Sequence, residues 1–152
     1  MNFTANDVKT LRERTGAGMM DCKNALAETG GDIQASIEII RKKGQAVAAK
    51  REDRQAAEGC VFAGTNGNFA AVVALKCETD FVAKNESFRT LTREILNAAL
   101  KAQPKDLEAL KGLAMEDGRT VAEHITDEIG KTGEKMELGV YAVSYTHLRA
   151  HE

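Results

Sequence analysis

The chain has 152 residues, a formal net charge of -2 and a pI near 6.0. This balance argues against broad nucleic-acid binding, and no apolar run is long enough to span a membrane. The first residues lack the features of a signal or transit peptide, and the three cysteines form no C-x-x-C pair, so we expect a cytoplasmic protein in a reducing compartment.

Residues 1–44 have the pattern of three short helices separated by glycines. Thr4 with Asp7 resembles a capping box, which predicts the start of the first helix. Asp32 is a good N-cap for the third helix, and we expect that helix to stop at Gly44. The sequence therefore predicts a small three-helix module, close to the lower size limit for independent folding.

Residues 45–58 are rich in alanine and charge and contain no proline, which predicts a partly helical linker. Basic residues cluster in and near this segment, but acids are interleaved with them. We interpret the cluster as a solvated face, with a weak phosphate or RNA contact as the alternative. The basic residues are Lys42, Lys43, Lys50, Arg51 and Arg54.

From residue 59 to 143 the pattern becomes mixed. Two β-prone runs flank Asn66-Gly67, which predicts a hairpin that brings Cys60 and Cys77 toward each other without indicating a bond. We expect a helix over 86–102, a short helix, a capped helix beginning after Thr120, and a strand over 136–143. The predicted fold class is therefore α+β, an N-terminal helical bundle followed by an antiparallel hairpin or sheet packed with helices.

The stretch Thr79-Asp80-Phe81-Val82 lies at the predicted strand-to-helix corner, and two interpretations are open. In the first, Thr79 or Asp80 caps a helix while Phe81 and Val82 turn into the core. In the second, the corner presents Asp80 and Phe81 to a partner. The carboxylate would compete for a cation or for N–H groups, and the ring would enter an apolar slot.

Residues 144–152 continue no clear periodicity, and we interpret them as a disordered or incidental tail that is not native sequence. Within the tail, His147 and His151 stand four residues apart with Glu152 adjacent. Two histidines without further ligands make a weak metal site, so we expect neither a metal nor a cofactor.

Two stretches resemble the signatures of the bacterial elongation factor Ts family. They are Leu11 to Lys23, LRERTGAGMMDCK, and Glu78 to Asn85, ETDFVAKN. The two occur in the family's order, and the resemblance covers about Met1 to Val143. Family members carry a second core subdomain that this sequence lacks, so we expect a truncated member that is a weak exchange factor at best.

The resemblance implies a guanine-nucleotide exchange factor that binds elongation factor Tu, without covalent catalysis, direct nucleic-acid contact or membrane binding. It implies a ubiquitin-associated-like module over 1–44 and an incomplete core domain over 59–143. It implies that Asp80 and Phe81, flanked by Thr79 and Val82, enter the GTPase near its magnesium and phosphates. In the module, the residues that it assigns to the GTPase contact are Leu11, Arg12, Met19 and Met20.

Alternatives to this interpretation remain. Met19 and Met20 are adjacent, so one helix face cannot bury both, but they can also fill gaps at a helix junction. An interaction adaptor without exchange activity is the alternative function. An enzyme is the third class, although the cysteines and His124 have no recognisable triad spacing. The sequence leaves the oligomeric state open.

Overall fold

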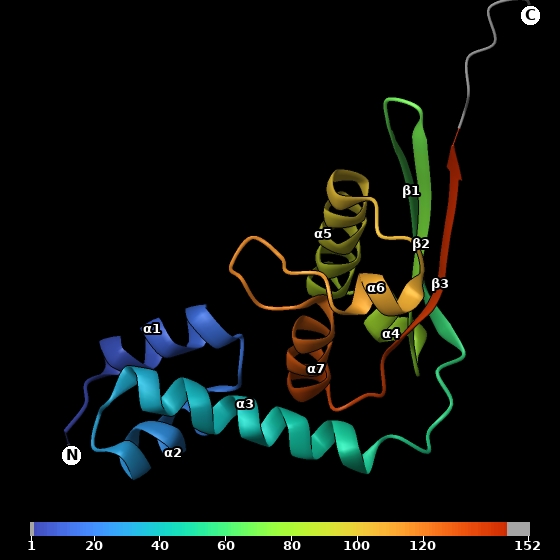
Figure 1. The fold of residues 1–152 in the computed structure, drawn as a ribbon. Helices are drawn as coiled ribbons and strands as arrows, with labels where there is room; N and C mark the ends of the chain where they lie inside the picture. Colours follow the sequence, from blue (N-terminus) through green and yellow to red (C-terminus); the bar gives the residue numbers. More distant parts are fainter. Residues whose placement is uncertain (1, 146–152) are drawn as a thin grey trace, which may run out of the picture. The chain divides into compact units, whose positions relative to one another are not determined.

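In the computed structural model, residues 2–145 are described, and they form seven helices and three strands (Figure 1). The predicted α+β class is confirmed. In the described part of the chain, no helix is both long enough and apolar enough to cross a bilayer. In chain order the elements are α1 (Ala5–Thr15), α2 (Met19–Thr29), α3 (Ile33–Lys50), β1 (Glu58–Asn66), β2 (Phe69–Cys77), α4 (Asp80–Ala83), α5 (Glu86–Ala102), α6 (Leu107–Lys111), α7 (Val121–Thr132) and β3 (Glu137–Tyr145).

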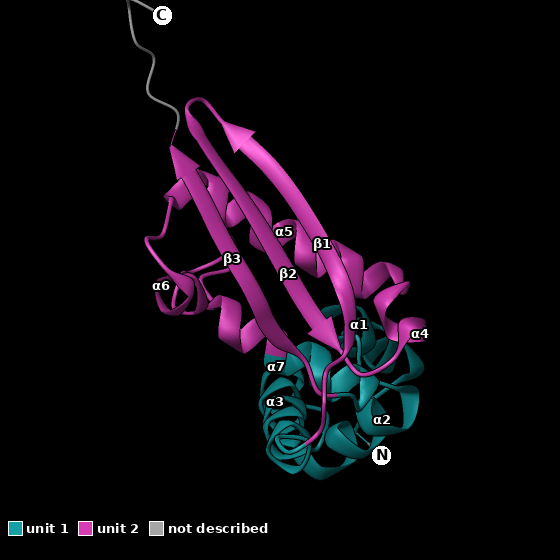
Figure 2. Cartoon of the chain, turned by 90° about the vertical axis from the view of Figure 1, so that its right-hand side faces the viewer, with its two compact units in different colours: residues 1–53, 126–134 teal, residues 54–125, 135–152 magenta. Residues whose placement is uncertain are grey.

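The chain divides into two compact units, coloured separately in Figure 2. Unit 1 comprises residues 1–53 and 126–134, and unit 2 comprises residues 54–125 and 135–152. Helix α7 therefore begins in unit 2, while its remaining turns belong to unit 1. The division of the sequence into a module, a linker, a core and a tail stays a prediction, as does the likeness of the module to ubiquitin-associated domains.

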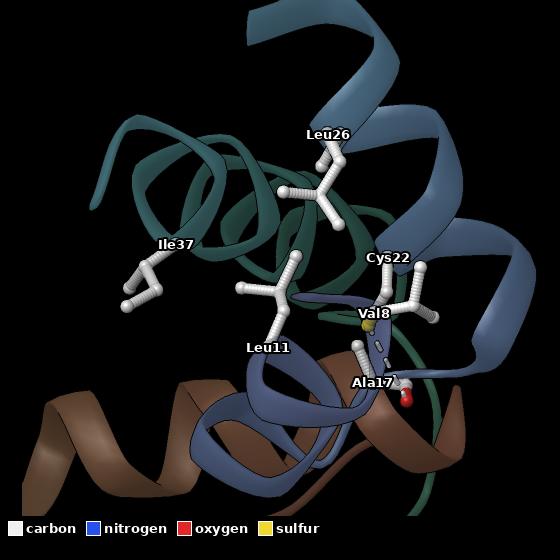
Figure 3. Packing of buried hydrophobic residues seen from close by; sticks show 7 residues of the cluster. Val8, Leu11, Ala17, Cys22, Leu26 and Ile37 are labelled. Atoms are coloured by element: carbon white, nitrogen blue, oxygen red, sulfur yellow. Dashed lines mark hydrogen bonds between the residues drawn. The ribbon is translucent and has the colours of Figure 1, made fainter. Parts of the chain in front are cut away.

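Unit 1 contains the three predicted helices. The Thr4 hydroxyl accepts the N–H of Asp7 while the Asp7 carboxylate accepts the N–H of Thr4, so the predicted capping box is confirmed. Gly16 has φ of 69°, a left-handed conformation that suits a helix C-cap. The helices share an aliphatic core that includes a buried thiol (Figure 3); its members are Val8, Leu11, Ala17, Cys22, Ala25, Leu26 and Ile37.

Helix α3 continues past Gly44 to Lys50, so the expected stop at that glycine is wrong. The Asp32 cap is confirmed, because its carboxylate accepts the N–H of Ala35. Gly44 is buried, and a Cβ there would lie 3.5 Å from the Thr126 carbonyl oxygen and 3.7 Å from the Gly130 Cα. This glycine thus serves the close packing of two helices within unit 1 and does not end a helix.

Unit 2 is built on an antiparallel sheet in the order β1-β2-β3. The predicted hairpin is confirmed: Asn66 pairs with Phe69, and Gly67 between them has φ of 61°, as a primed two-residue turn requires. Alternate residues of β2 are fully buried, and Figure 2 shows α5 behind the sheet. The buried face of α5 consists of Phe88, Leu91, Thr92, Ile95, Leu96 and Ala99.

Strand β3 runs to Tyr145, beyond the predicted end of the strand. Ser144 pairs with Ala70 and Tyr145 pairs with Phe69, and the two rings meet edge to face with centroids 5.1 Å apart. The predicted disorder is therefore wrong for Ser144 and Tyr145, because their backbone pairing extends the sheet. That the tail is not native sequence stays a prediction. The remaining tail, with His147, His151 and Glu152, lies outside the described residues.

Helix α7 begins as predicted. The N–H of Thr120 is held by the Glu123 carboxylate at 3.1 Å, and the N–H of Glu123 by the Thr120 hydroxyl at 3.2 Å, which is a complete capping box. The helix ends at Thr132, and Gly133 with φ of 73° follows it. The turn from α7 then leads into β3.

Candidate functional site

The corner between β2 and α5 is held by local hydrogen bonds. Cys77, the last residue of β2, is fully buried. Thr79 is the N-cap of α4: its hydroxyl accepts the N–H of Val82 at 3.4 Å, and its carbonyl accepts the N–H of Ala83 at 3.1 Å. Asn85 caps α5 by accepting the N–H of Ser87 at 2.9 Å. The corner is thus a single capped turn on a buried strand end.

Phe81 projects from this turn into solvent, with 83% of its surface exposed. The capping interpretation is confirmed at Thr79, but the burial of Phe81 that accompanied it is wrong. Val82 is half-buried, and neighbouring residues of a helix point about 100° apart, so a turn that leans on Val82 directs Phe81 outward. A fully exposed Phe forgoes about 1.5–3 kcal/mol of burial, which a partner with an apolar slot would recover.

Asp80 lies beside Phe81 on the same turn and is exposed. Its carboxylate is 3.8 Å from the ammonium of Lys84, one helical turn later, and both side chains are more than half exposed. Exposed pairs of this kind contribute little to stability, because water screens the charges and ordering the two side chains costs entropy. The structure therefore brings an accessible carboxylate and an accessible aromatic ring together at one corner.

Glu78 precedes this turn and is held more firmly. Its side chain is only 15% exposed, and Oε1 accepts the N–H of Lys135 at 2.8 Å. The other carboxylate oxygen lies 3.9 Å from the Arg54 guanidinium. Glu78 is not among the site residues that the sequence predicts, and no local signal points to it, because its hydrogen-bond partner is 57 residues away in the chain.

In unit 1, the predicted contact residues divide into surface and core. Arg12 is exposed near the end of α1, and Met19 and Met20 are 50% and 63% exposed in the first turn of α2. The interpretation that both methionines fill gaps at a helix junction is therefore wrong. Leu11 is fully buried in the core of the module, so it is not available for a direct contact with a partner.

The cysteines are free thiols tied to neighbouring structure. Burial raises the pKa of Cys22, outweighing the hydrogen bond with Thr15 that lowers it, which opposes the thiolate form that a nucleophile needs. Cys60 contacts the Thr92 hydroxyl at 3.1 Å, and the sheet register places it opposite Leu75. The Cys77 thiol donates to the Thr79 carbonyl at 3.2 Å, so it belongs to the corner.

His124 is engaged by a carboxylate. Its Nε2 lies 2.9 Å from Oδ1 of Asp117, which also accepts the N–H of Arg119 at 3.0 Å. This group stabilises the loop before α7. Within residues 2–145, no group of three or more His, Cys, Asp or Glu side chains is arranged to hold a metal ion.

Comparison with known proteins finds similarity to a single family. The family model described as elongation factor TS matches residues 78–149, which begins at Glu78 and runs past Val143, where the sequence resemblance was expected to end. A protein named elongation factor Ts from Porphyromonas gingivalis (strain ATCC 33277) is 58% identical over 97% of this chain and 56% of its own length.

Two further relatives carry the same name. The protein from Parabacteroides distasonis is 56% identical over 97% of this chain and 47% of its own length. The protein from Phocaeicola vulgatus is 57% identical over 100% of this chain and 47% of its own length. The chain therefore spans about half the length of the curated relatives it matches, and the similarity extends over both units.

Proposed function

The chain belongs to the elongation factor Ts family, and from this premise we propose that it is a guanine-nucleotide exchange factor for elongation factor Tu. Such a protein makes and breaks no covalent bond, and it acts in the cytoplasm during translation elongation. The observation that carries the proposal is the exposed Phe81 beside Asp80 on the capped turn. A rigid scaffold that holds an apolar ring in water is typical of a protein-binding site.

The proposed mechanism uses the two side chains in different ways. Phe81 enters an apolar slot of the GTPase and displaces the surroundings of its magnesium ion, while Asp80 engages polar groups there. Mg²⁺ demands near-octahedral geometry, so a small displacement of its surroundings weakens its binding. A weakened magnesium ion neutralises less of the phosphate charge, and GDP is released faster.

The N-terminal module supplies a second contact in this proposal. Met19 and Met20 present flexible apolar side chains, which adapt to a partner surface, and Arg12 adds a charged contact. Leu11 acts from the core by holding α1 in place, and Thr79 and Val82 act similarly for the corner. In this proposal the module adds to the interface area with the GTPase, whereas the Asp80–Phe81 turn displaces the surroundings of the magnesium ion.

The test is the rate at which elongation factor Tu releases a fluorescent GDP when this chain is added. Phe81→Ala should lower the stimulated rate at least tenfold, because a central aromatic anchor typically accounts for 2 kcal/mol or more. Asp80→Ala should lower it less. Val61→Ala is the matched control, since Val61 is an exposed apolar residue of the same unit at 64% exposure and belongs to β1, not to the Asp80–Phe81 turn.

Two outcomes would contradict the proposal. Equal stimulation by the Phe81→Ala and wild-type chains would remove the corner from the mechanism. Tight binding to the GTPase without any stimulation of release would favour the adaptor alternative.

A further inference from the structure

We propose that Glu78 is a positioning residue, which sets the direction in which the Asp80–Phe81 turn leaves the sheet. This inference rests on the proposed function, because it concerns how the corner is aimed at its partner. The corner's own hydrogen bonds are local: Thr79 accepts from Val82 and Ala83, within the turn itself. These bonds shape the turn, and the Cys77 thiol, which donates to the Thr79 carbonyl, joins it to the end of β2.

The Glu78 carboxylate ties the corner to a distant part of the chain. Oε1 accepts the backbone N–H of Lys135 at 2.8 Å, within the range of a strong charge-assisted hydrogen bond. Lys135 lies in the segment between α7 and β3, two residues before that strand begins. At 15% exposure, the carboxylate is largely shielded from competing water.

This hydrogen bond continues the link between β2 and β3 after their backbone pairing ends. The last pair in the register is Lys76 with Glu137. Two residues further along each chain direction, the Glu78 side chain accepts the Lys135 amide N–H. The turn therefore starts from a strand end that is held on its β3 side as well as by the hairpin partner.

Arg54 contributes a weaker interaction. Its guanidinium lies 3.9 Å from the second carboxylate oxygen, and its side chain is more than half exposed, so water screens the attraction. Of these two interactions, the hydrogen bond that the Glu78 oxygen accepts from the Lys135 N–H is therefore the stronger. Glutamine keeps such an oxygen at the same distance from the backbone, whereas alanine removes it.

The test measures stimulated GDP release from elongation factor Tu with Glu78→Ala, Glu78→Gln, Phe81→Ala and the double variant Glu78→Ala/Phe81→Ala. Glu78→Ala should lower the maximal stimulated rate about tenfold, the size expected when a hydrogen bond to a charged group is lost. Glu78→Gln should recover part of that rate, because its amide oxygen still accepts the Lys135 N–H but carries no charge. In the Phe81→Ala background, Glu78→Ala should have almost no further effect, because the ring that it aims is already gone.

Glu137→Gln is the matched control, since Glu137 is a carboxylate of the same sheet end whose nearest cations, Lys76 and Lys135, stand 3.9 Å away. It should leave the rate unchanged. Circular dichroism and urea unfolding of each variant show whether the fold survives, so that a loss of rate is not mistaken for a loss of structure.

The outcomes separate this inference from the proposed function. If Phe81→Ala slows release and Glu78→Ala slows it further by the same factor in both backgrounds, Glu78 does not act through the ring and the inference is wrong. The inference is also wrong if elongation factor Tu releases GDP as fast with the Glu78→Ala variant as with the wild-type chain. If Phe81→Ala itself has no effect, the proposed function fails, whatever Glu78 does.

Discussion

Gly44 of α3 and Gly130 of α7 meet backbone to backbone within unit 1. A Cβ added to Gly130 would lie 2.8 Å from the Gly44 Cα, closer than atoms pack in proteins. A Cβ added to Gly44 would meet its nearest neighbour, the Thr126 carbonyl oxygen, at an ordinary 3.5 Å. The two glycines therefore differ in what a methyl group would do.

We expect Gly130→Ala to lower the free energy of unfolding by about 1–3 kcal/mol, because the two helix backbones must move apart. Gly44→Ala should be neutral or raise it by up to about 1 kcal/mol, because alanine favours the helix interior over glycine. Urea unfolding of the two variants beside the wild type measures both effects. Equal losses in both variants would contradict the asymmetry of this contact.

Phe81 and Phe88 provide a matched pair on either side of Asn85. Phe88→Ala should destabilise unit 2 by about 3–5 kcal/mol, since Phe88 is fully buried in the α5 face. Phe81→Ala should change the unfolding free energy by less than about 0.5 kcal/mol, because its ring is exposed in the free chain. Thermal unfolding monitored by circular dichroism distinguishes the two, and comparable losses would place Phe81 in the core.

If the corner acts on the magnesium site, binding of this chain and of nucleotide must be mutually antagonistic. We expect a higher affinity for nucleotide-free elongation factor Tu than for its Mg²⁺–GDP form, by the same factor by which the chain weakens GDP. Isothermal titration calorimetry against both forms measures that factor. Equal affinities would exclude coupling between the two sites, since a ligand that binds both states equally shifts neither.

Arg12 and Met19 test the module. Arg12→Ala should slow association with elongation factor Tu, and Met19→Ala should speed dissociation, both without loss of helix content. Leu11→Ala is the contrasting variant: it should destabilise the module by about 2–5 kcal/mol, because it leaves a cavity in the core. Surface plasmon resonance gives the rates, and unchanged rates for Arg12→Ala and Met19→Ala would remove this surface from the interface.

The lowered pKa of Asp117 makes the free energy of unfolding depend on pH. Burial opposes its ionisation, but the hydrogen bonds with His124 and with the Arg119 N–H, helped by nearby positive charge, outweigh burial and lower its pKa. A lowered folded pKa stabilises the fold above the unfolded value, near 4, and that contribution is lost as the pH falls through the folded pKa.

We therefore expect the wild type to be more stable than Asp117→Asn at pH 7, and the difference to shrink below about pH 4. Urea unfolding across this range measures it. Glu116→Gln, which changes an exposed carboxylate in the same loop, is the control. A difference between wild type and Asp117→Asn that is independent of pH would show that the Asp117 charge is not its source.

The features that the sequence predicted well are those set by neighbouring residues. The capping boxes at Thr4 and Thr120 and the hairpin turn at Gly67 each depend on partners within three or four positions. The helix over 86–102 was likewise predicted correctly, because the spacing of apolar residues within a helix is a property of its own sequence.

The failures involve partners that are distant in sequence. The sequence pattern around Gly44 predicts a helix end, and only its packing against Gly130 shows why a glycine stands inside α3. Tyr145 looks like the continuation of an irregular tail until it pairs with Phe69. The exposure of Phe81 depends on which way a four-residue turn leans, and Glu78 on an amide supplied by Lys135. None of these relationships leaves a periodic or local trace.

Unit 1 is assembled from two stretches that the whole of 54–125 separates. On the ribosome, residues 1–53 are made first, and the turns of α7 that pack against Gly44 follow only after the hairpin and α5 have been synthesised. The N-terminal helices therefore cannot pack against α7 until it has been synthesised. Their contact with α7 closes a long loop of chain. We infer that the completion of unit 1 is a late event in folding, since long loops close at a higher entropic cost than local contacts.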